Sequence, residues 1–180
     1  MQLTTGRPAN MSGRLDKEVR VYDLLDQLQM AYQYVDHEAA ESMTVCEAIE
    51  KELNLTICKN LFLCNRQQTK FYLLMIRGDK VFKTKEISSQ INSPRLSFAS
   101  SERMAEFLDI TPGSVSVMGL MNDTDNNVSL LIDSEILSDE YFGCHPCINT
   151  TSLKIKASDL LDKFLPAVHH DYTEVYLTGE

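Results

Sequence analysis

The spacing of apolar residues divides the chain into helical and extended segments. Helical spacing over residues 15–34 predicts an amphipathic helix there, and Val35-Asp36-His37 follows as a short strand. Thr44-Val45-Cys46-Glu47 matches a capping box, in which the threonine hydroxyl and the glutamate carboxylate satisfy free amide groups at a helix start. This motif predicts a second helix over residues 44–53.

From residue 56 onward the apolar runs become short and are separated by polar turns, which indicates strands and short helices in alternation. Strands are predicted at residues 56–63, 71–76, 115–117, 128–132, 152–155 and 173–177, helices at 84–91, at 158–165 and from Ser100 to Pro112-Gly113, and a loop at 142–146. Several connections are too short for crossover helices. The sequence therefore predicts a mixed α/β (α+β) domain with one curved, mostly antiparallel sheet flanked by helices.

The first 13 residues differ from the rest, because they are polar and show no periodicity. We expect a flexible N-terminal arm at residues 1–13 and a single domain over residues 14–180. The chain has no apolar stretch near the 18–20 residues of a membrane span and no apolar core of a signal peptide at its start. Its five cysteines are an odd number. These features predict a cytoplasmic protein with at least one free thiol.

The charge of the chain limits its partners. With 17 Lys and Arg against 26 Asp and Glu, the formal net charge is −9, which excludes a protein that coats DNA or anionic membranes through its overall field. The distribution is uneven, because nine basic and only three acidic residues lie between Lys51 and Arg95. This segment is a candidate contact surface for one nucleic-acid end.

Two local patterns could carry chemistry, and neither is specific by itself. Cys144-His145-Pro146-Cys147 is a CxxC motif, which can serve in thiol exchange or bind zinc, but it lies between predicted strands and has no second pair at zinc-knuckle spacing. We interpret these thiols as packing residues. A Ser-His-Asp triad has no GxSxG turn to expose its serine, and no glycine-rich phosphate loop is present.

Lys59 is an unusual residue within an apolar strand. Alternation places Cys58, Asn60 and Phe62 on one face, and Lys59, Leu61 and Leu63 on the other. The lysine stem can lead its ammonium to water at the sheet edge, or the side chain can point into a cleft as a fixed cation. Alternation alone does not decide between the two.

Five sequence blocks, in this order and spacing, resemble the YbaK/prolyl-tRNA-editing family. They are Lys59-Asn60-Leu61-Phe62-Leu63, Arg95-Leu96-Ser97-Phe98-Ala99-Ser100, Thr111-Pro112-Gly113-Ser114-Val115-Ser116, Gly119-Leu120-Met121-Asn122-Asp123, and Gly143-Cys144-His145-Pro146 with Asn149-Thr150. The similarity runs from about residue 56 to residue 177 and is greatest to stand-alone prolyl-tRNA deacylases. It implies a mixed α/β domain that hydrolyses a wrongly attached amino acid, typically alanine, from tRNA for proline.

The resemblance also implies roles for individual residues. Lys59 and His145 would be catalytic, and Asn60, Gly143, Cys144 and Pro146 would bind the substrate. The reaction would be ester hydrolysis without a metal or another cofactor. Lys83, Lys85 and Arg95 are candidates for contact with the tRNA acceptor end. Prolyl-tRNA synthetase is a possible further partner.

Two departures from the family pattern leave the amino acid open. Residues 52–58 lack the glycines that many relatives have before the lysine, and Cys144 stands where an aromatic residue commonly lies. Both changes alter pocket volume, so cysteine or serine is an alternative to alanine. A second alternative is a module that binds aminoacyl-tRNA without turnover.

Overall fold

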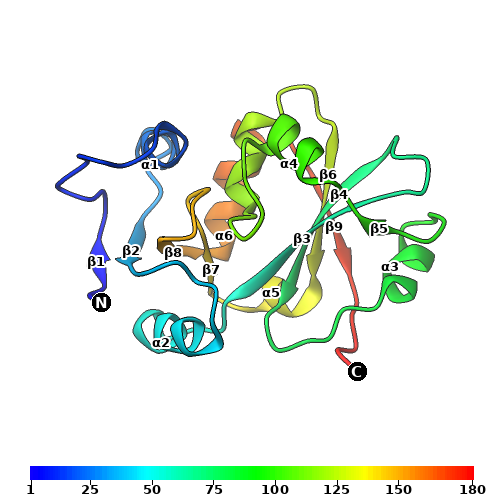
Figure 1. Cartoon of the computed structure of the whole chain (residues 1–180), viewed down its shortest axis with the longest axis horizontal. Helices are drawn as coiled ribbons and strands as arrows, with labels where there is room; N and C mark the ends of the chain where they lie inside the picture. Colours follow the sequence, from blue (N-terminus) through cyan, green and yellow to red (C-terminus); the bar gives the residue numbers. More distant parts are fainter.

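The computed structural model describes all 180 residues and contains two sheets and several short helices (Figure 1). The strands are β1 (Thr4–Thr5), β2 (Tyr32–Asp36), β3 (Cys58–Cys64), β4 (Phe71–Arg77), β5 (Ser97–Phe98), β6 (Val128–Asp133), β7 (Tyr141–Cys144), β8 (Thr151–Lys156) and β9 (Tyr172–Val175). The helices are α1 (Asp16–Gln27), α2 (Met43–Leu53), α3 (Thr84–Gln90), α4 (Ser101–Leu108), the 3₁₀ helix η1 (Val117–Asn122), α5 (Ser134–Ser138), α6 (Ala157–Asp159), the π-helical η2 (Leu160–Phe164) and α7 (Leu165–Ala167).

The strands form a four-stranded sheet in the order β1-β2-β8-β7 and a five-stranded sheet in the order β5-β3-β4-β6-β9. All pairs of the smaller sheet are antiparallel, as are β3 with β4 and β3 with β5. The pairs β4 with β6 and β6 with β9 are parallel. The mixed α/β class and the mostly antiparallel pairing are therefore confirmed, although the strands are divided between two hydrogen-bonded sheets instead of one.

Three apolar clusters hold the elements together. The largest contains 30 buried residues and joins α1, one face of both sheets and α4. A second cluster packs the other face of the five-stranded sheet against α3, and a third packs the other face of the four-stranded sheet against α2. Figure 1 shows the smaller sheet with α1 and α2 at one end of the molecule, and β5 with α3 at the other.

Several local predictions need correction. The first helix ends at Gln27 instead of residue 34, because Gln29 has a positive φ of 56° and Tyr32 begins a strand. The second helix is capped by the Ser42 hydroxyl, which accepts from the Val45 amide, so the Thr44 capping box is wrong. Residues 142–144 belong to β7 instead of a loop, because they pair with β8. Residues 115–117 form no strand.

The N-terminal segment, expected to be a flexible arm outside the domain, lies against it. β1 pairs with β2, and the Leu3 amide donates to Glu52 Oε1 at 3.1 Å. Arg7 forms an ion pair with Asp23 of α1 at 2.6 Å. Part of residues 1–13 is thus an edge strand of the smaller sheet. None of the helices has both the length and the hydrophobicity that are needed to cross a bilayer.

Candidate active site

Lys59 lies on β3 opposite Ile76 of β4, on the sheet face that packs against α3. The alternation expected from the sequence is confirmed, because Asn60 pairs with Met75, which belongs to the apolar cluster on the other face of the sheet. The Lys59 side chain is exposed, and its Nζ donates to the Lys80 carbonyl at 2.7 Å. The ammonium is therefore fixed by a backbone acceptor instead of a carboxylate, which leaves its charge uncompensated by a counter-ion.

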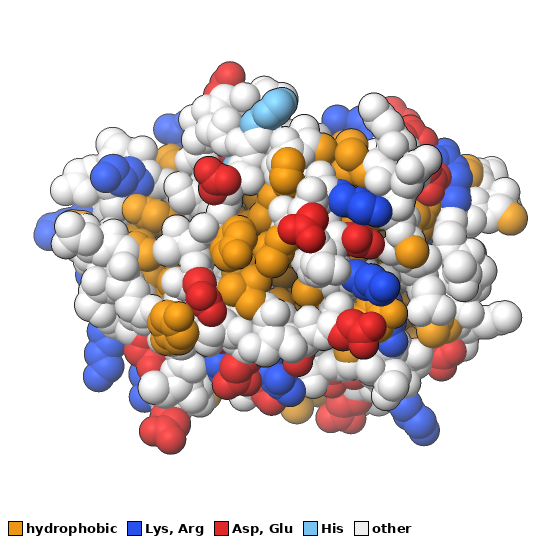
Figure 2. All heavy atoms as spheres, turned by 180° about the vertical axis from the view of Figure 1, so that it is seen from behind, with side chains coloured by type: hydrophobic (Ala, Val, Ile, Leu, Met, Phe, Trp, Pro, Cys, Tyr) orange, Lys and Arg blue, Asp and Glu red, His pale blue; other side chains and the backbone are white.

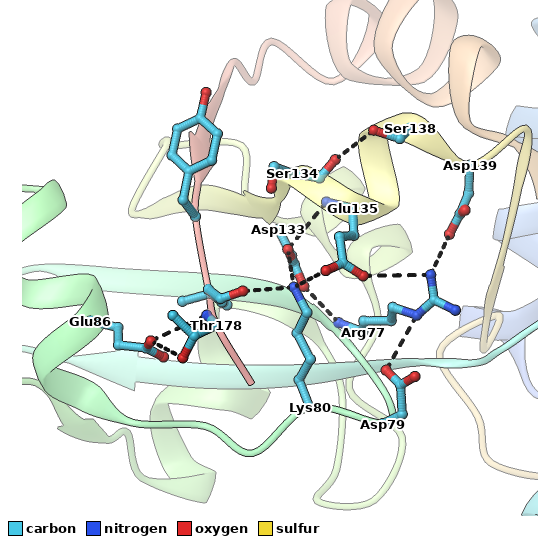
Figure 3. A network of polar contacts seen from close by, with 12 residues as sticks. Arg77, Asp79, Lys80, Glu86, Asp133, Ser134, Glu135, Ser138, Asp139 and Thr178 are labelled. Atoms are coloured by element: carbon cyan, nitrogen blue, oxygen red, sulfur yellow. Dashed lines mark hydrogen bonds and ion pairs between the residues drawn. The ribbon is translucent and has the colours of Figure 1, made fainter. Parts of the chain in front are cut away.

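The Lys80 turn that holds Lys59 is itself fixed by a buried charge (Figure 3). The Lys80 ammonium binds Asp133 Oδ1 and the Leu177 carbonyl, each at 2.9 Å, and reaches Glu135 at 3.1 Å. Burial acts to lower the pKa of Lys80, but its hydrogen bonds to Asp133 and Glu135 outweigh burial, and the pKa is raised. Sequence reasoning missed this residue, since nothing in its local pattern distinguishes it from a surface lysine.

The start of β3 is positioned by two close contacts. The Ile57 amide donates to Glu50 Oε1 of α2 at 2.9 Å. A Cβ on Gly78 would lie 2.2 Å from the Ile57 carbonyl oxygen, so only glycine allows this approach of the turn after β4. These contacts set the position from which Lys59 projects.

His145 directly follows β7, and its hydrogen bonds define its tautomer. Nδ1 lies 2.9 Å from the Thr151 carbonyl, which can only accept, so Nδ1 carries the proton. Burial lowers the pKa of His145, the Thr151 hydrogen bond partly opposes this, and nearby His37 lowers it further. The ring is therefore neutral near pH 7 and presents the lone pair of Nε2, which has no partner in the protein.

A second histidine extends this arrangement. His37 Nδ1 donates to the Glu38 carbonyl at 2.6 Å, so its Nε2 accepts from the Ser152 hydroxyl at 2.9 Å. The same Ser152 oxygen lies 3.4 Å from His145 Nδ1, and the two rings are 6.1 Å apart. Burial lowers the pKa of His37 as well. Neither His37 nor Ser152 was found by sequence reasoning, because β2 and β8 are brought together only by the tertiary fold.

Gly143 of β7 packs closely against the segment that precedes Lys59. A Cβ at Gly143 would lie 2.9 Å from Leu55 Cδ1 and 3.7 Å from Ile57 Cγ1, so this side of β7 faces the segment that leads into β3. Lys59 follows Ile57 by two positions, and alternation directs both to the same side. His145 is on this side too, because it contacts Ser152, whose strand partner Val35 packs beneath α2. Lys59, Gly143 and His145 thus share one side of the domain, although Lys59 and His145 have different hydrogen-bond partners.

Asn60 and Cys144 lie on the opposite side, toward the main core. Asn60 Oδ1 is buried without a hydrogen-bond partner, and the Cys144 thiol is hydrogen-bonded to the Ser116 side chain. Burial raises the pKa of Cys144. The structure therefore separates these two predicted substrate contacts from Lys59 and His145.

One further sequence block, at residues 111–116, meets the His145 loop. Pro146 is buried, the Asn149 carbonyl accepts from the Ala40 amide at 3.2 Å, and a Cβ on Gly113 would lie 3.8 Å from Asn149 Nδ2. Ser116 of the same block reaches Cys144. Blocks separated by some 30 residues in the sequence thus meet around one loop.

Lys83, Lys85 and Arg95 also meet in space. They line a cavity of about 790 Å³ together with Phe82, Thr84, Ser88, Ser89 and Phe98, and no carboxylate lines it. Lys83 and Lys85 lie at the start of α3 and Arg95 lies after its end, yet all three cations surround one hollow. We call this the basic groove.

Comparisons with known proteins identify the family of the chain. A family model described as "Aminoacyl-tRNA editing domain" matches residues 37–163. The chain belongs to this family. The chain is therefore an aminoacyl-tRNA deacylase, a hydrolase of the ester that joins an amino acid to tRNA.

Individual relatives are similar over most of this editing domain. "Prolyl-tRNA editing protein ProX" of Acetoanaerobium sticklandii is 30% identical over 146 residues, covering 81% of this chain and 89% of that protein. "Prolyl-tRNA synthetase associated domain-containing protein 1" of Danio rerio is 27% identical over 160 residues, covering 87% and 85%. A solved structure described as a candidate trans-editing enzyme for prolyl-tRNA synthetase has a TM-score of 0.65 at 13% identity, covering 89% of this chain and 97% of that one.

The five thiols of this editing domain are all free. Cys147 is fully buried, and burial raises its pKa to about 12, so it is far from the thiolate form at neutral pH. Burial likewise raises the pKa of Cys58 to about 12. The motif Cys144-His145-Pro146-Cys147 therefore contributes a histidine to the site and two packing thiols to the core.

Proposed function

We propose that this editing domain is a trans-editing hydrolase that removes alanine from mischarged tRNA(Pro). The proposal rests on three groups that lie on one side of the domain. They are the Lys59 ammonium, the Gly143 backbone and the Nε2 atom of His145, which has no hydrogen-bond partner in the protein. The relative from Acetoanaerobium sticklandii bears the name of a prolyl-tRNA editing protein, which supports tRNA(Pro) as the substrate.

In the proposed reaction, water attacks the ester carbonyl carbon, and the bond to the ribose oxygen breaks. The Lys59 ammonium orients the aminoacyl end and stabilises the negative charge that develops on the carbonyl oxygen. His145 Nε2 accepts a hydrogen bond from the attacking water, and the released proton reaches the leaving ribose oxygen. The products are free alanine and tRNA. An aminoacyl ester is already activated, so positioning and charge suffice, and the scheme uses no metal.

The other predicted residues have different tasks in this proposal. Gly143 allows β7 to lie close to the segment that leads into β3, because any side chain there would meet Leu55. Asn60 and Cys144 face the core, so in this proposal they support the strands of the site from the opposite side, and the buried Pro146 fixes the loop that carries His145.

Selectivity for alanine would come from exclusion. Steric overlap rejects the larger proline more strongly than the loss of a few contacts would reject a smaller residue. Cysteine and serine are only slightly larger than alanine, and they are the competing substrates that the assay must include.

The tRNA would be held at one end only. Figure 2 shows acidic and basic side chains interspersed on the face seen from behind, without a continuous basic field. The basic groove with Lys83, Lys85 and Arg95 is the proposed contact for the acceptor end. Such a limited contact gives modest, salt-sensitive affinity. We place this activity in the cytoplasm, beside prolyl-tRNA synthetase.

The test is hydrolysis of tRNA(Pro) charged with alanine, cysteine, serine or proline by the purified protein. We expect rapid loss of alanine, little loss of proline, and a strong decrease in kcat for Lys59→Ala and His145→Ala. A wild type that binds these substrates without releasing any amino acid would be a binding module, and the proposal would be wrong. Lys70→Ala is the matched control, because this exposed lysine lies beyond the far end of β3.

A further inference from the structure

The basic groove and the cavity that adjoins it contain the two arginines that have no carboxylate partner. Of the seven arginines in the chain, five form ion pairs with Asp or Glu, namely Arg7, Arg14, Arg20, Arg77 and Arg103. Arg66 and Arg95 form none, and Lys83 and Lys85 form none either. In a chain with an excess of acidic residues, four unpaired cations around one surface leave a local positive field.

An aromatic ring stands exposed among these cations. Phe98 is 66% exposed, and it is the one phenylalanine of seven that is classed as exposed. It lines both the basic groove and an adjoining cavity of about 580 Å³, which contains Arg66, Arg95 and no carboxylate. An exposed ring of this size is costly to hydrate, and its position at the junction of two basic hollows indicates a ligand with both charge and flat apolar faces.

The ring is held in place by its surroundings. Phe98 lies on the edge strand β5 opposite Leu63, and the following Ala99 amide donates to the Phe62 carbonyl at 2.9 Å. Phe82 meets the Phe98 ring at 6.2 Å with an interplanar angle of 64°, as in an edge-to-face pair. The sheet therefore fixes the backbone that carries the ring, and Phe82 contacts the ring on one side.

Phe98 faces the same way as Lys59. Paired residues of antiparallel strands project to the same side, so Phe98 shares the side of Leu63, which lies four residues after Lys59 on β3. Four residues of a strand extend about 13 Å. At about 3.4 Å for each stacked nucleotide, this is roughly the length of a short unpaired 3′ end.

We propose that Phe98 is a stacking platform for an unpaired base at the 3′ end of the RNA, with Arg66, Lys83, Lys85 and Arg95 contacting the adjacent phosphates. Cations along the backbone and an aromatic face for the base are the combination that binds single-stranded nucleic acid. The inference rests on the proposed function and adds a base contact that the phosphate contacts alone do not supply.

The absence of tryptophan from the chain permits a direct test. In a Phe98→Trp variant the single indole reports on this position only. We expect its fluorescence to be quenched by a short single-stranded RNA that ends in CCA, and to be unaffected by inorganic triphosphate or by the same RNA with its terminal bases removed. Equal quenching by triphosphate would overturn the stacking role.

Phe98→Leu keeps the apolar contact and removes the ring. We expect this variant to bind the RNA about fivefold to a hundredfold more weakly with an unchanged salt dependence, whereas Arg95→Gln should reduce the salt dependence. Tyr176→Leu, which alters another exposed ring, is the control and should bind like wild type. Unchanged affinity of Phe98→Leu, or a change in self-association by sedimentation instead, would refute the proposal.

These experiments distinguish failure of the deacylation proposal from failure of the Phe98 stacking proposal. If the wild type binds the RNA through Phe98 but releases no amino acid, the deacylation proposal is wrong and the platform stands. If the wild type releases alanine and Phe98→Leu has the same KM for the charged tRNA, the platform is wrong and the deacylase stands. Circular dichroism of each variant verifies its fold before either comparison.

Discussion

Replacing Lys80 with methionine tests how much the buried ion pair beneath the Lys59 turn contributes to stability. The Lys80 side chain is 7% exposed and that of Asp133 is fully buried, so the substitution leaves a carboxylate in the interior without its counter-ion. Breaking a buried pair in this way costs about 3–5 kcal/mol. Asp133 keeps hydrogen bonds from the Arg77 and Glu135 amides, each at 3.2 Å, so we expect the lower end, about 3 kcal/mol.

The assay is equilibrium unfolding in urea, followed by far-ultraviolet circular dichroism, with the midpoint shift converted through the m value. A double-mutant cycle with Asp133→Asn isolates the pair, and the double variant should be less destabilised than the sum of the two single variants. The control is Glu106→Gln, which removes the exposed partner of Arg103 and should cost less than about 1 kcal/mol. A cost for Lys80→Met as small as that of the control would refute the reasoning.

Four further predictions follow from single contacts. Burial lowers the pKa of His145 below its ordinary 6.5, so between the two values the unfolded chain binds more protons than the folded one, and the urea midpoint should fall on acidification from pH 7 to pH 5. His145→Gln should flatten this fall, and an unchanged slope would contradict it. Gly78→Ala should cost about 1–3 kcal/mol and reduce deacylation, because the new Cβ meets the Ile57 carbonyl; an unaffected variant would show that the turn is not held there. Ser42→Ala should cost about 1 kcal/mol and Thr44→Ala clearly less in the same urea assay, and the reverse order would restore the capping box. In the folded protein a thiol reagent should modify the half-exposed Cys46 first and Cys147 only on unfolding, whereas rapid labelling of Cys147 would revive a redox role.

The pattern of the sequence predicted those elements that local interactions decide. The strands around Lys59 and the helix from residue 84 were placed within one or two residues, and the Ser100 cap was identified, because alternation and capping involve near neighbours. The prediction failed where the helical spacing of apolar residues continued into a segment that pairs as a strand. Tyr32 fits the helical period of the first helix, but its hydrogen bonds to β8 hold it in a strand.

The candidate site shows the same division. The motifs around Lys59 and His145 identified these two residues as candidates, and alternation alone predicted the face of the strand on which Lys59 lies. The separation of Asn60 from Lys59 was also contained in that alternation. The neighbours of Lys59 and His145 could not be predicted from the sequence, since His37, Ser152 and Lys80 are distant in the sequence and ordinary in their local context.

By itself, then, the sequence of this editing domain determined its family, its element types and the residues with chemical potential, because each depends on local pattern or on motifs in order. Only the tertiary structure decided which lone pair His145 presents, that a buried Lys80 fixes the carbonyl beside Lys59, and that four unpaired cations surround the exposed Phe98. These properties arise from contacts between distant segments, and burial changes the charge state and the freedom of each side chain only once those segments have met.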